Sequence, residues 1–286
     1  MIDFTLNDEH VLLEQSIREW GARNVVPYIR ENDRNHHFDR ERILGGLSEL
    51  GLLGISVPQQ YGGAGMDYIS LGIASEELEY VDTSLRVIMS VHAGLNCLSL
   101  LTWGSEDQKK RYLVPQAQGR KIAMFALDQG RFTVAAGATG LIRACRDASA
   151  KYAKERKTFG VEIAQHQLVK EMIAQMESDY QAARLLWLRA GWLKNNGGRN
   201  TRETGLAKWF ATVASERAAG DAVQIHGANG YSDEYPVGRF YRNCKGAVIY
   251  EGTREIHKLM QADYVLGYRV DRPTRCELPP YGKADA

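Results

Sequence analysis

The chain has few cysteines, no long apolar run and almost no net charge. Its four cysteines are scattered, with no Cys-x-x-Cys pair and no histidine spacing that resembles a zinc site, so we expect reduced thiols and no metal. No stretch of about 18 apolar residues occurs, and the N-terminus lacks the basic and apolar regions of a secretory signal. We therefore expect a cytoplasmic protein that does not span a membrane.

The balance of charge excludes another class of partner. The 36 Lys and Arg residues against 35 Asp and Glu leave a formal charge of +1, which creates no general attraction for nucleic acid or for an anionic membrane. Any anionic ligand must then be held by local charges. At 286 residues and 44% hydrophobic, the chain is long enough for about two domains with a substantial core.

Helical periodicity dominates the pattern that is present. Apolar residues step by three or four from Leu168 to Trp187, and Asn195-Asn196-Gly197-Gly198 then supplies residues that end a helix. A second helix is predicted from Glu203 to about Ile225, antiparallel to the first, with Leu206, Phe210 and Val213 on one side. Asn7 and Asp67 are expected to cap two earlier helices.

Signals for strands and for nucleotide loops are weak. The best strand candidates, Ile122–Leu127 and Ala247–Tyr250, have no regular partners of the kind that a sandwich or barrel requires. The glycines of Gly62-Gly63-Ala64-Gly65 do not have the spacing of a dinucleotide fingerprint or a P-loop, so we interpret them as a turn. A predominantly α-helical fold follows.

Several segments, in this order, resemble the acyl-CoA dehydrogenase family, and the resemblance extends from about Asp8 to Gly267. They are VPQQYGGAG (Val57–Gly65), WGSEDQKKRYLVPQAQG (Trp103–Gly119), KIAMFAL (Lys121–Leu127), YAKERKTFG (Tyr152–Gly160), QIHGANGY (Gln224–Tyr231) and IYEGTREI (Ile249–Ile256). The family combines an N-terminal helical domain, a middle β-barrel domain and a C-terminal four-helix bundle. Here the chain runs from Leu127 straight into a segment that resembles the first bundle helix.

The resemblance therefore implies an all-α fold without the middle β-barrel domain. We expect an N-terminal helical domain over residues 1–127, a C-terminal helical bundle over 128–270 and an extension over 271–286. Because the join at Leu127–Gly130 is clean on both sides, deliberate deletion of the domain explains it more simply than natural loss.

The activity implied by the resemblance is FAD-dependent α,β-dehydrogenation of an acyl-CoA thioester. Glu251 matches the base that removes the α-proton, although an isolated glutamate outside this motif would be interpreted as a solvated surface residue. Such a base works best where desolvation raises the pKa of the carboxyl toward the working pH. Tyr250 and Gly252 flank Glu251 on the substrate side. Some relatives carry the base at the position of Gly130, which cannot remove a proton.

Cofactor contacts are implied at two further motifs. Arg156 matches a residue that holds the FAD pyrophosphate across a dimer interface, and its fork suits phosphate, although a salt bridge at a helix end explains it equally well. The glycines of the Gln-x-x-Gly-x-x-Gly element allow close backbone approach. The full set of matched FAD positions is Arg156, Thr158, Phe159, Gln167, Gln224, Gly227, Gly230, Thr253 and Glu255.

Three residues match contacts to the substrate. Asp128 and Arg131 correspond to CoA-side positions, but they lie at the join and also fit simple helix capping. Arg86 resembles the arginine with which glutaryl-CoA dehydrogenases hold a distal carboxylate, and it equally fits a surface arginine after a turn. No histidine has the spacing of a metal ligand.

Loss of the middle domain should change both cofactor binding and assembly. We expect impaired flavin binding and activity, a homodimer or homotetramer that covers newly exposed apolar surface, and electron-transfer flavoprotein as the acceptor known for the parent family. Two alternatives stay open: a non-catalytic helical scaffold that keeps only the family fold, and a CoA-binding module without flavin.

Overall fold

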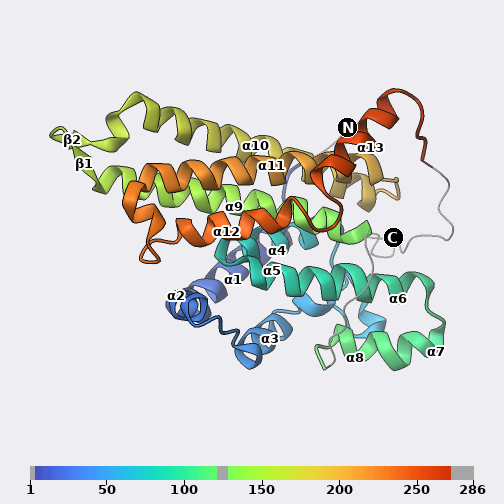
Figure 1. The fold of residues 1–286 in the computed structure, drawn as a ribbon. Coiled ribbons are helices and arrows are strands. Elements are labelled where there is room, and N and C mark those ends of the chain that lie inside the picture. Colours follow the sequence, from blue (N-terminus) through green and yellow to red (C-terminus); the bar gives the residue numbers. More distant parts are fainter. Residues whose placement is uncertain (1–3, 121–127, 272–286) are drawn as a thin grey trace.

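A computed structural model describes residues 4–120 and 128–271, with the side chains of residues 128 and 129 left out (Figure 1). The N-terminal part contains α1 (Asp8–Asn24), α2 (Val26–Arg34), α3 (Arg40–Glu49), α4 (Tyr68–Val81), α5 (Thr83–Met89), a π-helical stretch (Ser90–Cys97), α6 (Leu98–Trp103), α7 (Glu106–Gln108) and α8 (Val114–Ala117). The C-terminal part contains α9 (Asp128–Glu155), β1 (Lys157–Thr158), β2 (Val161–Glu162), α10 (Gln167–Asn195), α11 (Thr201–His226), α12 (Val237–Ala247) and α13 (Arg254–Val265).

The described residues confirm the predicted all-α fold class. Their only strands are β1 and β2, a two-stranded hairpin between α9 and α10. The strand predicted over Ile122–Leu127 lies outside the described residues. The strand predicted over Ala247–Tyr250 is wrong, because Ala247 ends α12 and the residues after it form the turn toward α13. Without a partner strand, a short apolar segment has no ladder to join.

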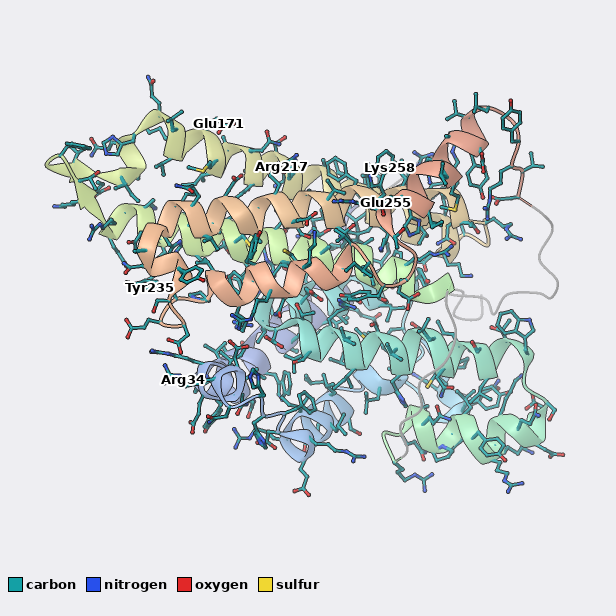
Figure 2. All side chains as sticks on the ribbon, in the orientation of Figure 1. Arg34, Glu171, Arg217, Tyr235, Glu255 and Lys258 are labelled. Atoms are coloured by element: carbon teal, nitrogen blue, oxygen red, sulfur yellow. The ribbon has the colours of Figure 1, made fainter. Side chains whose placement is uncertain are left out.

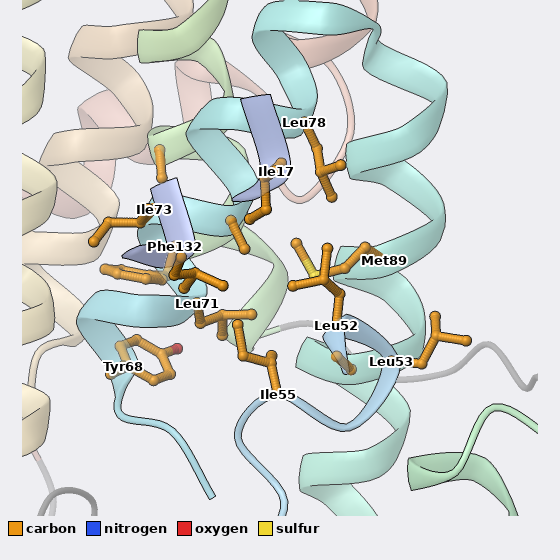
Figure 3. Packing of buried hydrophobic residues seen from close by; sticks show 14 of the residues in the cluster. Ile17, Leu52, Leu53, Ile55, Tyr68, Leu71, Ile73, Leu78, Met89 and Phe132 are labelled. Carbon is orange, nitrogen blue, oxygen red and sulfur yellow. The ribbon is translucent and has the colours of Figure 1, made fainter. Parts of the chain in front are cut away.

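Local chemistry starts the N-terminal helices as predicted. Asn7 Oδ1 accepts a hydrogen bond from the His10 amide at 2.8 Å, and Asp67 Oδ1 accepts one from the Ser70 amide at 2.8 Å, so both residues cap their helices. Nearly every residue of α4 is buried, since α1, α9 and α10 surround it. Figure 3 shows Leu71 and Ile73 of α4 packed in one core with Phe132 of α9.

The C-terminal helices α9, α10, α11 and α12 form a bundle in which α10 and α11 run side by side (Figure 1). Both predicted long helices are present. Leu206, Phe210 and Val213, which were predicted to share one side of α11, are half-buried, while an alanine-rich face, with Ala207 and Ala211, is fully buried against α9. Small side chains let the two helix backbones approach closely.

The two parts of the chain are joined by close packing of α4 on α9. A Cβ built at Gly140 would lie 2.0 Å from the backbone oxygen of Glu76, so only glycine fits there. The buried Glu76 carboxylate accepts hydrogen bonds from Tyr180 Oη at 3.2 Å and Trp187 Nε1 at 3.1 Å, and Arg143 and Arg184 lie nearby. Burial raises the pKa of the Glu76 carboxyl, although the positive charges of Arg184 and Arg143 act to lower it. This polar cluster links α4, α9 and α10.

One segment is more apolar than the sequence analysis allowed. Thr83–Trp103 spans 21 residues through α5, the π-helical stretch and α6, and an 18-residue window within it has a mean hydropathy of 1.3, which is enough by length and composition alone to cross a membrane. Within the protein, 61% of that window is buried, and the π-helical stretch contacts α9. That burial is typical of a core helix.

Candidate active site

Glu251 lies in the turn between α12 and α13, in a backbone conformation that side chains rarely adopt. Its φ is 59° and that of Gly252 is 90°, both in the left-handed region. For a residue other than glycine this conformation costs roughly 1–2 kcal/mol, and such strain concentrates at functional sites. Among the described residues, the other non-glycine positions with positive φ are His36 and Phe159, and Phe159 is also a predicted site residue.

The carboxylate of Glu251 lies against the first turn of α9. A Cβ built at Gly130 would lie 2.3 Å from both Cδ and Oε1 of Glu251, and the Oε2 atom is buried. The solvated alternative for Glu251 is therefore wrong. The two positions that carry the base in different relatives meet at one place in this chain, and the absence of a side chain at Gly130 leaves the space that the carboxylate occupies.

Three side chains from three helices donate to the backbone of this turn. Arg131 Nε of α9 donates to the Glu251 carbonyl oxygen at 3.2 Å, and His257 Nε2 of α13 lies 3.3 Å from the same oxygen. Lys208 Nζ of α11 donates to the Gly252 carbonyl oxygen at 2.7 Å. Arg131 therefore contacts the main chain of this turn.

The charges at this turn are mostly positive. Burial lowers the pKa of Lys208 to about 8. The negative charge of Glu251 acts to raise this pKa, and the positive charges of Arg131 and Arg86 act to lower it further. Burial, followed by the charges of Lys208 and Arg131, lowers the pKa of His257 to about 4, so its imidazole is neutral at pH 7. We assign the ring proton to Nε2, the atom that faces the Glu251 carbonyl.

Arg86 reaches the same site from α5. Its side chain is only 2% exposed, so the surface alternative is wrong. Its Nε donates to the buried Glu79 and its Nη2 donates to the hydroxyl of Tyr250, whose ring lies 5.4 Å from the guanidinium carbon. Burial raises the pKa of Tyr250, so the phenol stays protonated. The chain Glu79–Arg86–Tyr250 thus ends beside Glu251.

A second group of predicted residues lies at the far end of α9, around the β1–β2 hairpin. Arg156 follows the last residue of α9, is exposed, and forms no ion pair with any residue that the structure describes, so the predicted alternative of a helix-end salt bridge is not observed. Thr158 Oγ1 lies 2.9 Å from His166 Nε2. Phe159 is 95% exposed with a φ of 52°, and Gln167 is exposed at the start of α10.

The predicted glycine element lies at the same end. Gln224 is exposed in the last turn of α11, and a Cβ built at Gly227 would have nothing within 4 Å. Gly230 is buried, and a Cβ there would lie 2.4 Å from the Val223 backbone oxygen. Asn229 anchors this segment through a hydrogen bond of 2.9 Å to the Tyr152 hydroxyl of α9. The backbone at Gly227 is therefore open, at the same end of α9 as Arg156.

The remaining predicted cofactor residues lie beside Glu251 instead. Thr253 caps α13, with Oγ1 accepting from the Ile256 amide at 3.5 Å. Glu255 is exposed on α13 (Figure 2), and its hydrogen bond from Arg254 lowers the pKa of its carboxyl to about 2. Asp128 heads α9, but its side chain is outside the described residues.

The two groups do not meet within one copy of the chain. They lie at opposite ends of α9, which has 28 residues, and at 1.5 Å per residue they are about 40 Å apart. A ligand that touches both Arg156 and Glu251 in one molecule would have to span that length. Lys208, His257 and Glu79 also belong to the site, although no motif in the sequence indicated them. One feature of the sequence is consistent with the burial of Lys208: its neighbours on the same face of α11 are small, namely Thr204, Ala211, Thr212 and Ser215.

Comparison with known proteins gives two family matches. The model for the acyl-CoA dehydrogenase N-terminal domain matches residues 7–120, and the model for the acyl-CoA dehydrogenase C-terminal domain matches residues 117–266. Together they extend over most of the chain. The two matched segments meet directly, with no room between them for a middle domain.

Individual relatives agree with this division. A glutaryl-CoA dehydrogenase from Desulfococcus multivorans is 27% identical over 386 aligned positions, which cover 94% of this chain and 99% of the relative. A mitochondrial short-chain specific acyl-CoA dehydrogenase from Mus musculus is 26% identical over 375 positions, which cover 91% of each chain. A solved structure of glutaryl-CoA dehydrogenase with glutaryl-CoA is 26% identical, with a TM-score of 0.88 and coverage of 93% of this chain and 97% of that chain. The sequence alignments exceed 286 residues in length, so they bridge a long stretch that this chain lacks.

Proposed function

Because the chain belongs to the acyl-CoA dehydrogenase family, we propose that it is a two-domain form of an FAD-dependent acyl-CoA dehydrogenase in which Glu251 is the catalytic base. The observation that carries the proposal is the position of the Glu251 carboxylate, which lies against Gly130 in a strained and strongly held turn. A carboxylate in such a place can reach a substrate without a search through rotamers.

The chemistry of this chain is removal of the α-proton of an acyl-CoA thioester by Glu251. The electron pair of that C–H bond becomes the new C=C bond as a hydride leaves the β-carbon. FAD, when bound, supplies the acceptor for that hydride. Lys208 interacts electrostatically with Glu251 and donates to the Gly252 carbonyl of the same turn.

The residues around the hairpin fit a dinucleotide from a second copy of the chain. Arg156 is an exposed guanidinium without an ion pair among the described residues, and the Gly227 backbone at the same end of α9 is open. Phe159, Leu168 and Tyr231 are 95%, 79% and 94% exposed, and large apolar side chains at such exposure are typical of surfaces that an assembly covers. We therefore propose at least a homodimer, in which Arg156 of one copy and Glu251 of another serve one FAD.

The missing domain sets the strength of cofactor binding. In the family it packs against the isoalloxazine, and each 1.4 kcal/mol of lost contact weakens binding about tenfold. Our proposal is that FAD binds more weakly than in full-length relatives and that turnover falls with it. Deliberate deletion accounts for the direct join, and electron-transfer flavoprotein would remain the electron acceptor.

Substrate preference is proposed from Arg86. It is buried beside Tyr250, and a carboxylate at the end of a short acyl chain would compete with Glu79 for its guanidinium. A dicarboxylic acyl-CoA such as glutaryl-CoA fits this arrangement, and the similarity to glutaryl-CoA dehydrogenases supports it.

Flavin retention separates this proposal from a non-catalytic scaffold. Purified protein is saturated with FAD and desalted, and its visible spectrum is recorded. We expect a flavin spectrum at partial occupancy, which added FAD increases and which Arg156→Met reduces more than the exposed control Arg40→Met. A colourless protein at every FAD concentration would favour the scaffold.

A further inference from the structure

The Glu251–Gly252 turn is held by more donors than a surface turn of this length needs. Two consecutive carbonyl oxygens receive side chains from α9, α11 and α13, namely Arg131, His257 and Lys208. Both Lys208 and His257 are 0% exposed. These helices are far apart in the sequence, so the convergence is a property of the fold.

Burial of Lys208 is costly, since an ammonium group loses its hydration when it leaves water. That cost is normally offset by an ion pair with a carboxylate. The structure shows instead that Nζ donates to the Gly252 carbonyl at 2.7 Å, while Glu251 and Glu255 lie within electrostatic range. A methionine would fill a similar space on α11 without this cost. We therefore interpret the charge and the hydrogen-bond donor of Lys208 as acting on the turn.

The turn needs such support because its backbone is strained. Glu251 is held at a φ of 59° although it has a side chain, and a relaxed φ would rotate the Cα–Cβ bond away from Gly130. His257 also approaches Gly252 closely, since a Cβ built there would lie 3.2 Å from its Nε2. The donors fix the carbonyl directions, and the carbonyl directions fix where the carboxylate points.

We propose that Lys208 and His257 are positioning residues that, with Arg131, lock the Glu251–Gly252 turn so that the Glu251 carboxylate faces Gly130. The inference rests on the proposed function only for the role of the carboxylate. The charged groups that interact with Lys208 are Glu251, Arg131, Arg86 and Glu255, and His257 is coupled electrostatically to Lys208 and Arg131.

Hydrogen–deuterium exchange of the turn tests the lock without flavin or substrate. The amides of Ile249 and Tyr250 bond the Gly246 carbonyl, and the amide of Arg254 bonds the Val248 carbonyl, so all three report opening of the turn. Lys208→Met should speed their exchange at least about tenfold, as loss of a hydrogen bond from a charged donor predicts. Exchange in α9 and α10 should not change.

Lys208→Arg keeps a charged donor and should restore slow exchange, whereas the control Lys151→Met, at an exposed position of α9, should match the parent protein. Unchanged exchange at these three amides in folded Lys208→Met would overturn the proposal. If that variant does not fold, His257→Leu, which also removes one donor, decides the question by the same measurement.

Activity gives an independent second measurement. In FAD-loaded protein, Lys208→Met should lower kcat more than it changes KM, because displacement of the turn moves the base away from its productive position. A protein that binds no flavin would defeat the proposed function and leave the exchange result intact. Normal exchange with normal flavin binding would defeat the lock alone.

Discussion

Replacement of Gly130 by alanine should displace the Glu251 carboxylate without lowering the stability of the protein. The new Cβ would lie 2.3 Å from Cδ and Oε1 of Glu251, whereas ordinary contact begins near 3.4 Å. The carboxylate must therefore move by about 1 Å, and a displacement of that size can cost about a hundredfold in rate. The group that moves is the end of a flexible side chain, so folding is not opposed. Alanine in a helix is favoured over glycine by roughly 0.5–1 kcal/mol.

We therefore expect Gly130→Ala to melt at the same temperature as the parent protein or slightly higher, and to reduce its flavin about a hundredfold more slowly with acyl-CoA. Thermal melting and anaerobic stopped-flow absorbance measure the two effects. Gly220→Ala is a matched control, because its Cβ would lie 3.9 Å from the nearest atom, on Tyr241 of α12. Flavin reduction at the parent rate, or destabilisation by several kcal/mol, would contradict the expected displacement of the Glu251 carboxylate.

Three further changes test the packing of α4 on α9, the burial of His257 and the site shared between two copies. Gly140→Ala places a Cβ 2.0 Å from a backbone oxygen of α4, so it should lower the free energy of unfolding by about 1–3 kcal/mol in urea titrations, while Gly220→Ala should not. His257 has a folded-state pKa of about 4 against 6.5, so the unfolded chain binds its proton first. Stability should fall by up to about 3 kcal/mol between pH 6.5 and 4, and His257→Gln should abolish that loss in urea unfolding at the two pH values. If Arg156 of one copy and Glu251 of another serve one FAD, co-expression of Glu251→Gln with Arg156→Met should restore flavin-dependent activity that neither variant has alone. No recovery of activity would contradict a site shared between two copies.

Much of the fold was predictable because it depends on local chemistry. Asn7 and Asp67 cap the helices that their sequence positions indicate, and the apolar stripe from Leu168 to Trp187 forms one helix. The buried face of α11 was not predictable, because it depends on packing. The close approach of α9 leaves room there only for the alanines, while Leu206, Phe210 and Val213 are half-buried.

The candidate site was predictable only through motifs. Glu251 and Arg86 were found by resemblance, and the structure adds that Arg86 is buried and paired with Glu79. Lys208 donates to a carbonyl 44 residues away, and no periodicity in the sequence can show such a contact. The same holds for Gly130, whose importance depends on a carboxylate that reaches it from a distant turn.

The proposed role of Glu251 is that of the base in a flavin-dependent dehydrogenation. Its most direct test is anaerobic bleaching of the flavin absorbance by glutaryl-CoA or butyryl-CoA in FAD-loaded protein and in Glu251→Gln. The parent protein should bleach, and Glu251→Gln should bleach at least about a hundredfold more slowly, since general-base catalysis contributes that much or more. Equal bleaching in the two proteins would contradict the assignment of Glu251.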